Sequence, residues 1–449
     1  MTNARVDADR LPPDVRLLAP WYADQRPDDL AAHVRRHGPL PEAGAEELAE
    51  LVDDAGLRGR GGSGFPTAVK LRAVAARRPR RLGSRRAVVV ANGCEGEPAS
   101  GKDAALLHCA PHLVLDGIAI AATGLGASEA ILCVHEGSPG LEPLRRHASA
   151  RHDPVPVRIE TVPARYVASE ESALVQYLNG GPPVPTTAPP RPAERGVGGA
   201  PTLVDNVETL AHLALIARHG PTWFRALGTP DLPGTLLVTI GGALRRPGVV
   251  EIAAGTPIGD VLDLACGPTE PVHAVLSGGY GGAWLGLHDP ATLRTPLTHE
   301  ALRAAGSVLG VPTLLALPAR ACGLAQTAHL LRYLAGESAG QCGPCRFGLP
   351  AVADDVAAIV HGTPEARRAH GRLARRLDLV AGRGACAHPD GAARLARSAL
   401  RVFAQDLKQH LAGQPCRAAA GAPVFPMREP SIPHLPAQRA RPGTGARSR

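Results

Sequence analysis

The chain has 449 residues, of which 44% are hydrophobic and 20% charged, so it is not wholly disordered and has room for about two to four domains. The formal net charge is +8, but residues 413–449 contain six arginines and one acidic residue and supply +5 of that charge. The rest of the chain is nearly balanced and has no basic face with interspersed aromatic residues, so we expect no nucleic-acid partner.

The first half of the sequence predicts helices that alternate with strands. Residues 1–42 are rich in proline and charge and predict an N-terminal extension with one helix near residues 27–36. A helix at residues 45–54 follows, and a glycine-rich loop then leads into a helix that begins at Pro66. Beyond the loop, the pattern predicts strands at 87–90, 130–134 and 155–160, helices at 103–122, 141–150, 169–178 and 206–218, and a connection at 182–202. This alternation favours a parallel α/β sheet, which we assign to residues 43–228.

The second half of the sequence changes character twice. Residues 229–305 predict a small β-rich module that opens with a hairpin at residues 236–252. Residues 306–412 predict a helical bundle, because apolar residues recur there at spacings of three and four. Residues 413–449 combine arginine, proline and alanine and predict a disordered basic tail.

The glycine-rich loop Gly59–Gly64 matches the pattern G-x-G-x-x-G. An ordinary Rossmann fingerprint requires a strand before the loop, and here a helix precedes it. The loop nevertheless leads into a helix N-terminus, where free backbone N–H groups and the helix dipole favour phosphate, and Lys70 adds a positive charge one turn later. The loop therefore predicts a phosphate site, with a purely structural glycine turn as the alternative.

Two polar segments follow predicted strands. Residues 92–98 come after the first strand, at the end of a parallel strand where α/β proteins bind ligands. Residues 169–172 follow a later strand and place Glu170 and Glu171 at the start of a helix. A binding role is one interpretation of both segments. The alternatives are a solvated loop for the first and simple partners of the helix dipole for the second.

The sequence Cys342-Gly343-Pro344-Cys345 is the sharpest local signal. A thioredoxin-like redox site would need a strand before it and a surrounding sheet, and the pattern here is helical. Iron–sulfur ligation fits better, with Cys386 as a third ligand and no obvious fourth. Zinc bound with the help of His388, and inert buried thiols, remain alternatives.

The other cysteines and the lack of targeting segments concern the location of the protein. Four cysteines in apolar runs are expected in the core: Cys109, Cys133, Cys266 and Cys322. Cys416 lies in the tail and is expected to be free. An odd total of nine cysteines fits a reduced compartment better than a disulfide scaffold. No secretory signal and no membrane-spanning run is expected, so the sequence predicts a soluble cytoplasmic protein.

Taken together, several motifs resemble the NADH-binding flavoprotein subunit of respiratory complex I and its relatives in bidirectional hydrogenases and soluble formate dehydrogenases. The segments that carry the resemblance are residues 56–67, 92–103, 166–174, 201–209, 277–282 and 337–346. It covers roughly residues 43–412. It implies a Rossmann-like FMN/NAD domain, a β-grasp (soluble-ligand-binding) module and a four-helix bundle with an iron–sulfur site.

The chemistry that this resemblance implies is hydride transfer from NAD(P)H to FMN, followed by single-electron transfer through an iron–sulfur cluster. The cluster would be [4Fe–4S], with a three-iron cluster as the alternative. The acceptor would be a ferredoxin-like or other iron–sulfur subunit or a quinone-reductase partner, reached within a complex that can associate with a membrane. The flavin would carry the reaction, while the protein positions and tunes it.

The resemblance also implies residue roles, by motif position. The residues expected to hold the phosphate region of FMN are Gly59, Arg60, Gly61, Gly62, Ser63, Gly64 and Lys70. The residues expected to contact the isoalloxazine or ribityl groups are Asn92, Asp205 and Asn206. Tyr166 and Thr209 are expected to complete the cofactor site. Phe65 would stack on the adenine of the nucleotide. The carboxylates expected at the catalytic centre are Glu95, Glu97, Glu170 and Glu171, and the expected iron ligands are Cys342, Cys345 and Cys386.

Several positions depart from the family pattern. Ala339 replaces the first cluster cysteine, so a four-iron cluster would need an unusual ligand: Ser338, His388, Cys322 or water. Cys94 and Asp205 stand where the family has Asp and Asn, and Ala188 and Arg191 replace residues that help to hold NADH. These departures leave a second hypothesis, a non-catalytic or NADH-independent assembly subunit with a degenerate nucleotide site.

Overall fold

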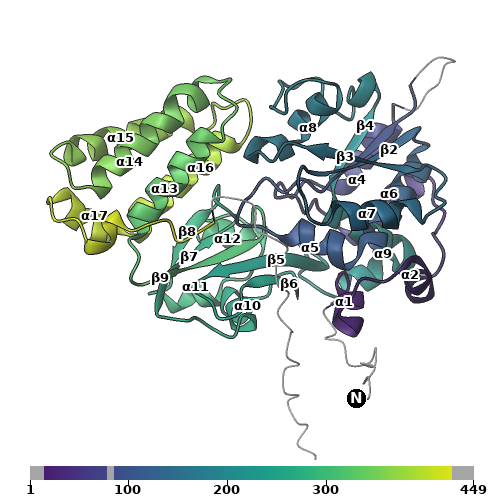
Figure 1. Cartoon of the computed structure of the whole chain (residues 1–449), viewed down its shortest axis with the longest axis horizontal. Coiled ribbons are helices and arrows are strands. Elements are labelled where there is room, and N and C mark those ends of the chain that lie inside the picture. The colour runs from purple at the N-terminus through teal and green to yellow at the C-terminus, as the bar shows by residue number, and fades with distance from the viewer. Residues whose placement is uncertain (1–14, 78–84, 427–449) are drawn as a thin grey trace, which may run out of the picture.

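Two β-sheets and a group of C-terminal helices form the part of the chain that the computed structural model describes, residues 15–77 and 85–426 (Figure 1). The first sheet has the strand order β3-β2-β1-β4, and all of its neighbouring strands run parallel. Its strands are β1 (Val88–Asn92), β2 (Glu129–His135), β3 (Val157–Val162) and β4 (Thr202–Asn206). The predicted parallel α/β architecture is confirmed.

The strand β4 was not predicted. The prediction ended a proline- and glycine-rich connection at Thr202 and began a helix at Asn206, and it assigned the three residues between them to no element. A five-residue strand that passes directly into α9 (Val207–Arg225) shows no alternation of its own, and only its pairing with β1 identifies it.

Helices cover both faces of the first sheet. They are α3 (Ala45–Ala55), α4 (Thr67–Ala75), α5 (Lys102–Cys109), α6 (Pro111–Leu125), α7 (Leu141–Ser149), α8 (Glu171–Leu178) and α9. Helix α6 is almost wholly buried and packs against α9. Gly117 permits this packing, because a Cβ at that position would lie 2.0 Å from the carbonyl oxygen of Leu210.

The single helix predicted over residues 103–122 is wrong. The chain bends by 95° between α5 and α6, because Pro111 lacks an N–H and begins a new helix. Among the described residues, no single helix is long and apolar enough to cross a membrane, although this bent pair passes the same test when its two helices are taken together.

The predicted N-terminal extension is packed into the protein from residue 15 onward. It contains α1 (Ala19–Asp24) and α2 (Leu30–His37), and Leu17 and Leu18 are fully buried in the same core as the first sheet. The backbone N–H groups of residues 16–18 donate to the Glu251 carboxylate at distances of 2.9–3.0 Å. This carboxylate belongs to a strand of the second sheet, so the segment joins the two sheets.

The second sheet is mixed, with the strand order β6-β5-β9-β7-β8. Its strands are β5 (Thr235–Gly242), β6 (Gly248–Ala253), β7 (Val272–Ser277), β8 (Ala283–Gly286) and β9 (Thr313–Pro318), and its helices are α10 (Ile258–Leu264), α11 (Pro290–Arg294) and α12 (His299–Ala304). The β5–β6 hairpin agrees with the prediction. The limit predicted at residue 305 is wrong, because β9 lies at the centre of the sheet, parallel to β5.

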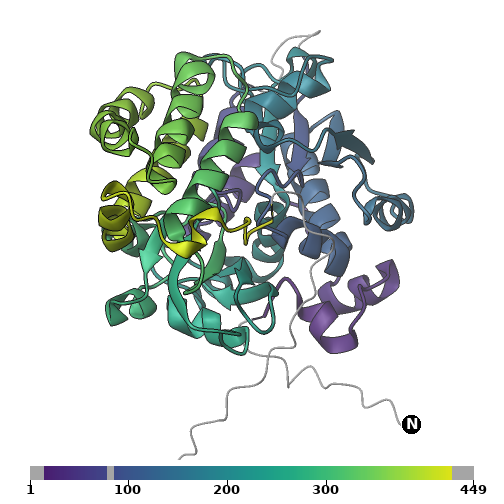
Figure 2. The ribbon, with the colours of Figure 1, turned by 60° about the vertical axis from the view of Figure 1, so that its left-hand side comes forward.

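The C-terminal helices stack against this second sheet, as Figures 1 and 2 show. They are α13 (Gly323–Gly336), α14 (Leu349–Val360), α15 (Ala366–Val380), α16 (His388–Val402) and α17 (Ala404–Leu411), with a short π-helical turn at Pro344–Gly348. Trp284 of β8 and Phe403, between α16 and α17, make an edge contact with ring centroids 5.2 Å apart. The predicted helical bundle is therefore present, and it shares a core with the sheet.

The prediction of disorder is wrong for residues 413–426. This segment contains a 3₁₀ turn at Arg417–Ala420 and runs back from α17 toward the second sheet (Figures 1 and 2). Phe425 is buried, with its ring centroid 6.0 Å from that of Trp284. The remaining residues of the predicted tail, 427–449, lie outside the described part of the chain.

Candidate active site

The carboxyl ends of β1 and β4 form the centre of the site. The parallel register pairs Asn92 with Asn206 and Ala91 with Asp205, so polar side chains from two strands end at one edge of the sheet. The Asn206 side-chain amide donates to the Asn92 carbonyl at 3.3 Å, and its oxygen accepts the Glu208 N–H at 3.0 Å, which caps α9. The structure thus brings together two residues that are 114 positions apart in the sequence.

A buried lysine supports these strand ends. The Nζ of Lys102 lies 2.5 Å from Asp103 Oδ1, 2.9 Å from Glu208 Oε2 and 3.2 Å from Asn206 Oδ1. Burial lowers the pKa of Lys102, but the neighbouring carboxylates outweigh it and leave that pKa above its ordinary value. Lys102 therefore carries a fixed positive charge that orients Asn206. Sequence reasoning missed Glu208, which lies only two residues after a motif asparagine.

The glycine-rich loop folds over the same edge. The Gly59 N–H donates to the Phe65 carbonyl at 2.8 Å, which closes the loop just before α4. The Arg60 N–H donates to Thr209 Oγ1 at 2.8 Å, so Thr209 fixes the loop to α9. A Cβ on Gly61 would lie 3.3 Å from the Cβ of Asn206, so a side chain there would press on the end of β4. Loop and strand ends therefore form one site.

The side chains within the loop divide into two groups. Arg60 is buried and its guanidinium donates to the Pro233 carbonyl at 2.8 Å, so this side chain is engaged within the protein. Gly61, Ser63 and Phe65 are exposed, and Phe65 as a whole residue is 37% exposed. The open side of the loop thus presents backbone groups, the Ser63 side chain and the Phe65 side chain.

Asp205 has a buried carboxylate with an unpaired oxygen. Among the described residues, Asp205 Oδ2 has no hydrogen-bond partner. Burial raises the pKa of Asp205 to about 6, with Lys70 opposing the shift and Glu171 adding to it. Because a buried polar atom without a partner is costly, this oxygen fits a site that a donor group of a bound cofactor completes.

Lys70 reaches the site, but it is already paired. Its Nζ lies 2.7 Å from Glu171 Oε2 and 2.9 Å from the Val204 carbonyl. Burial lowers the pKa of Lys70, and the charges of Asp205 and Glu171 more than reverse this effect. The role of Lys70 in holding the FMN phosphate stays a prediction, and its observed partners place its charge beside Asp205.

Glu95 and Glu97 lie in the loop after β1. Glu97 is buried, and its Oε2 accepts the Tyr280 N–H at 2.8 Å and the Tyr166 hydroxyl at 3.3 Å. Burial raises the pKa of Glu97 to about 7. Burial and the charge of Asp103 raise the pKa of the Glu95 carboxyl to about 8, against the effect of Lys102. Both carboxyl groups can therefore hold or release a proton near neutral pH.

The paired glutamates at α8 have different partners. Glu170 caps the helix, because its carboxylate accepts the N–H groups of Ser172 at 3.0 Å and Ala173 at 3.1 Å. This is the structural alternative that the sequence left open for Glu170. Glu171 instead points its charge at Lys70, as described above.

Tyr166 connects the strand-end site to the helical bundle. Its N–H donates to Glu337 Oε2 at 3.0 Å, and its ring centroid lies 5.2 Å from that of His388. Since its hydroxyl donates to Glu97, one side chain contacts both the loop after β1 and the helices that carry the cysteines.

Three predicted cluster cysteines come together from two turns of the bundle. Cys342 and Cys345 precede α14, and Cys386 precedes α16. Burial raises the pKa of the Cys345 thiol to about 12, and the neighbouring thiols of Cys342 and Cys386 add to this shift. The hydroxyl of Ser338 acts on the same thiol in the opposite direction. Three thiols from two separate turns are a donor set that fits the ligation of an iron–sulfur cluster.

The other cysteines are distributed differently from the prediction. Cys109 and Cys133 are buried in the core as expected, whereas Cys266 is exposed. Cys322 is buried at the start of α13, where its Sγ lies 3.8 Å from His410 Nε2. This contact makes Cys322 a poor candidate for the missing cluster ligand.

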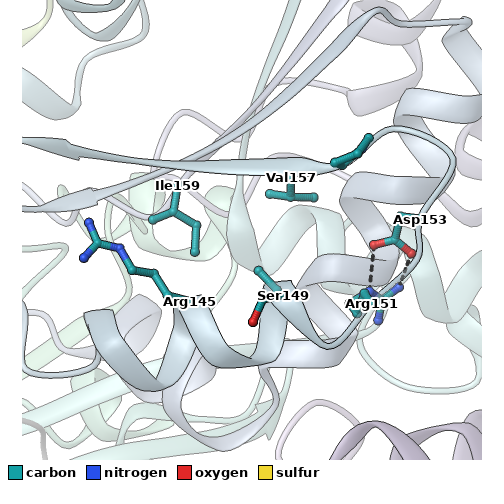
Figure 3. Close-up of a pocket in the computed structure, with 8 residues that line it drawn as sticks. Arg145, Ser149, Arg151, Asp153, Val157 and Ile159 are labelled. Atoms are coloured by element: carbon teal, nitrogen blue, oxygen red, sulfur yellow. Dashed lines mark hydrogen bonds and ion pairs between the residues drawn. The ribbon is translucent and has the colours of Figure 1, made fainter.

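A separate pocket of about 310 Å³ lies between α7 and β3 (Figure 3). Within it, Arg151 forms an ion pair with Asp153 at 2.7 Å, and Val157 and Ile159 point from β3 toward α7. None of the predicted site residues lines this pocket. It is therefore not part of the active site.

Comparison with known proteins matches three regions of this chain to family models. Family models match residues 52–215 (Nuo51 FMN-binding domain), 237–282 (SLBB domain) and 325–410 (NADH-ubiquinone oxidoreductase-F iron-sulfur binding region). An F-type NADH-quinone oxidoreductase subunit of Rhizobium meliloti is 30% identical over 396 residues, which cover 84% of this chain and 91% of that protein. This chain belongs to the family of F-type NADH-quinone oxidoreductase subunits. The Streptomyces coelicolor member is 31% identical over 387 residues, covering 83% of this chain and 84% of the relative.

A solved structure extends the same relationship. The chain is similar to a chain of an NAD⁺-reducing [NiFe]-hydrogenase in its H₂-reduced state, with 33% identity and a TM-score of 0.77 over 91% of this chain and 70% of that one. As a member of the F-type family, the protein is an FMN- and iron–sulfur-containing electron-transfer subunit of an NADH oxidoreductase. The recognition of this family from sequence motifs is confirmed, and the alternative of a non-catalytic assembly subunit is not favoured.

Proposed function

We propose that this chain oxidises NADH with FMN bound between the glycine-rich loop and the ends of β1 and β4, and that Cys342, Cys345 and Cys386 hold the cluster that receives the electrons. The observation that carries the proposal is the unpaired buried oxygen Asp205 Oδ2, where the loop and the strand ends meet. Bound FMN would supply hydride acceptance and one-electron release, which no side chain provides.

The chain contributes binding and orientation at this site. Asn92, Asp205 and Asn206 would bind the polar edge of the ring or the ribityl group. The backbone N–H groups of residues 61–64, next to the N-terminus of α4, would hold the phosphate. The exposed ring of Phe65 would stack on the nucleotide's adenine, since aromatic faces bind flat heterocycles.

Proton handling falls to the carboxyl groups after β1. Glu97 would hold a proton near neutral pH, because burial raises its pKa to about 7 while Tyr166 and Tyr280 fix its position. Glu95, and Glu171 with its partner Lys70, would border the nicotinamide. Glu170 would act only as the cap that positions Glu171.

The cluster would be of the four-iron type, with a fourth ligand that is not cysteine. Ser338, next to Ala339, is the best candidate, because its hydroxyl lowers the pKa of the Cys345 thiol, although it also donates to the Ala335 carbonyl at 2.9 Å. The acceptor beyond this cluster would be another iron–sulfur protein of the same complex. FMN and the nucleotide would bind within residues 43–228 and the cluster within the helices after β9. The protein would work in the cytoplasm, attached to a membrane only through its complex.

The test is to record absorbance and EPR spectra of the purified chain, supplied with flavin, iron and sulfide, before and after NADH is added. The expected results are flavin absorbance that bleaches with NADH and a cluster EPR signal. Cys345→Ser should lose most of the iron and keep flavin, whereas Cys266→Ser, at an exposed thiol, should keep both. A chain that binds no flavin, or flavin that NADH leaves oxidised, would contradict the proposal.

A further inference from the structure

Cys322, His410 and Cys416 form a second group of metal-ligating side chains, which shares no residue with the iron–sulfur set. Their ligand atoms all lie within 4.8 Å of one another, and Cys322 Sγ is 3.8 Å from His410 Nε2. Tetrahedral zinc with bonds of about 2.3 Å to sulfur and 2.0 Å to nitrogen separates its ligands by about 3.5–3.8 Å. The group is thus close to the spacing of a bound ion.

The orientation of His410 is the second observation that indicates a metal. The ring is fully buried, and its Nδ1 lies 2.7 Å from the Val360 carbonyl, to which it donates. The proton is therefore on Nδ1, and Nε2 is the acceptor nitrogen. It accepts the Cys416 N–H at 3.5 Å, a long contact that a bound ion would replace, and it lies 3.8 Å from Cys322 Sγ. Histidines that bind metals are held in this way, with the non-ligating N–H fixed by a carbonyl or carboxylate.

Local backbone structure delivers the two thiols to this histidine. Cys322 is the N-cap of α13, and its Sγ accepts the Ala325 N–H at 3.4 Å. Helix α17 ends just after His410, and Gly413 adopts φ +75°. The Gln414 N–H then bonds back to the Gln409 carbonyl at 3.1 Å. This reversal brings the chain back across the end of α17, so Cys416 lies beside His410.

We propose that Cys322, His410 and Cys416 bind one Zn²⁺ ion, with water in the fourth position. The two thiols lose their protons to solvent on binding, so the two thiolates balance the charge of the ion. Zinc suits this set, because it is a borderline-soft ion that accepts sulfur and nitrogen together and needs no redox change. Cys416 is partly exposed, which leaves access for the water.

The bound ion would fix the position of the chain segment that follows Cys416. Beyond Cys416, the side chain of Gln326 on α13 donates to the Ala422 carbonyl at 3.1 Å and accepts the Val424 N–H at 2.8 Å. The described part of this segment runs to Pro426, whose carbonyl accepts the hydroxyl of Tyr280. The Tyr280 N–H in turn donates to Glu97, a carboxylate of the flavin site. The zinc ion would therefore hold in place a segment that contacts this tyrosine.

The experiment is metal analysis of the full-length holoprotein, purified under reducing conditions and given one equivalent of Zn²⁺. We expect about one zinc per chain, with a zinc-edge X-ray absorption spectrum that fits two sulfur and two nitrogen or oxygen neighbours. Cys416→Ser should lose at least about tenfold in zinc affinity, as expected for the loss of a ligand, while flavin and iron contents stay unchanged. Cys266→Ser is the matched control and should keep its zinc.

Three outcomes would overturn the proposal. The first is a wild-type protein that retains no zinc after this treatment. The second is Cys416→Ser protein with full zinc content, which would assign the ion to the cluster cysteines. The third is a Cys322–Cys416 disulfide, found by mass spectrometry of the reduced preparation. The zinc-edge X-ray absorption spectrum of the wild-type protein tests the ligand set even if the variant fails to fold.

Discussion

Replacing Asp205 with asparagine tests the flavin site most directly. The pKa of Asp205 is raised from 3.8 to about 6, so the carboxylate is ionised at pH 7 and mostly protonated at pH 5. If FMN donates a hydrogen bond to the ionised oxygen, affinity is full above the raised pKa and falls as the pH drops through it. At pH 5 about one-eleventh of the sites are ionised, so FMN should bind about tenfold more weakly than at pH 7, or about 1.4 kcal/mol.

The assay is a fluorescence titration of the flavin-free protein with FMN between pH 5 and pH 8. The FMN phosphate also titrates near pH 6, so the informative quantity is the difference between the wild type and Asp205→Asn. The Asn variant should lose the tenfold change that Asp205 contributes. Asp53→Asn, at an exposed position on α3, should keep the wild-type slope. Parallel wild-type and Asp205→Asn profiles would refute the reasoning.

The same substitution should stabilise the flavin-free protein. For a carboxyl group whose folded pKa is raised, the cost of burial is absent below the unfolded pKa and complete above the folded one. A shift from 3.8 to about 6 corresponds to a cost of about 3 kcal/mol above pH 6. Asp205→Asn should therefore raise the melting temperature at pH 7 and leave it nearly unchanged at pH 3.5, provided that the protein stays folded there.

Three further substitutions test other parts of the structure. Glu97→Gln should remove a titration near pH 7 from the rate of NADH oxidation, because burial raises the pKa of this carboxyl to about 7; an unchanged pH profile would count against its role as a proton carrier. Gly117→Ala should cost about 3 kcal/mol in denaturant unfolding, since its Cβ would lie 2.0 Å from the Leu210 carbonyl oxygen, whereas Gly140→Ala, with open space, should cost far less. Lys102→Met should cost about 3–5 kcal/mol by leaving buried carboxylates unpaired, and a loss below about 1 kcal/mol would contradict the proposed charge balance.

Local patterns in the sequence were sufficient to predict the parts of the fold that depend on nearby residues. The βα alternation predicted the parallel sheet, and the glycine-rich loop and the Cys342–Cys345 motif were recognised without any long-range information. The strands β4 and β9 could not be placed in this way, because their positions depend on pairing with β1 and β5. A short buried strand has no periodicity that separates it from a loop or a buried helix.

The site was predictable to a similar extent. Motif positions identified Asn92 and Asn206, but not that the strand register sets them side by side. Glu170 appeared to be equivalent to Glu171, and only the hydrogen bonds distinguish a helix cap from a partner of Lys70. Composition likewise indicated a disordered tail, since no local pattern reveals that one phenylalanine packs against a tryptophan of the second sheet.

The contact between residues 16–18 and Glu251 has a consequence for the synthesis of this protein. Arg16 lies 235 residues before its carboxylate partner, so the ribosome must add that many residues before the contact can form. At about 5–20 residues per second, this takes on the order of 10–50 s. The backbone N–H groups of Leu17 and Leu18 lack their carboxylate acceptor for nearly the same interval. The segment at residues 16–18 therefore completes its hydrogen bonding only after more than half of the chain has been made.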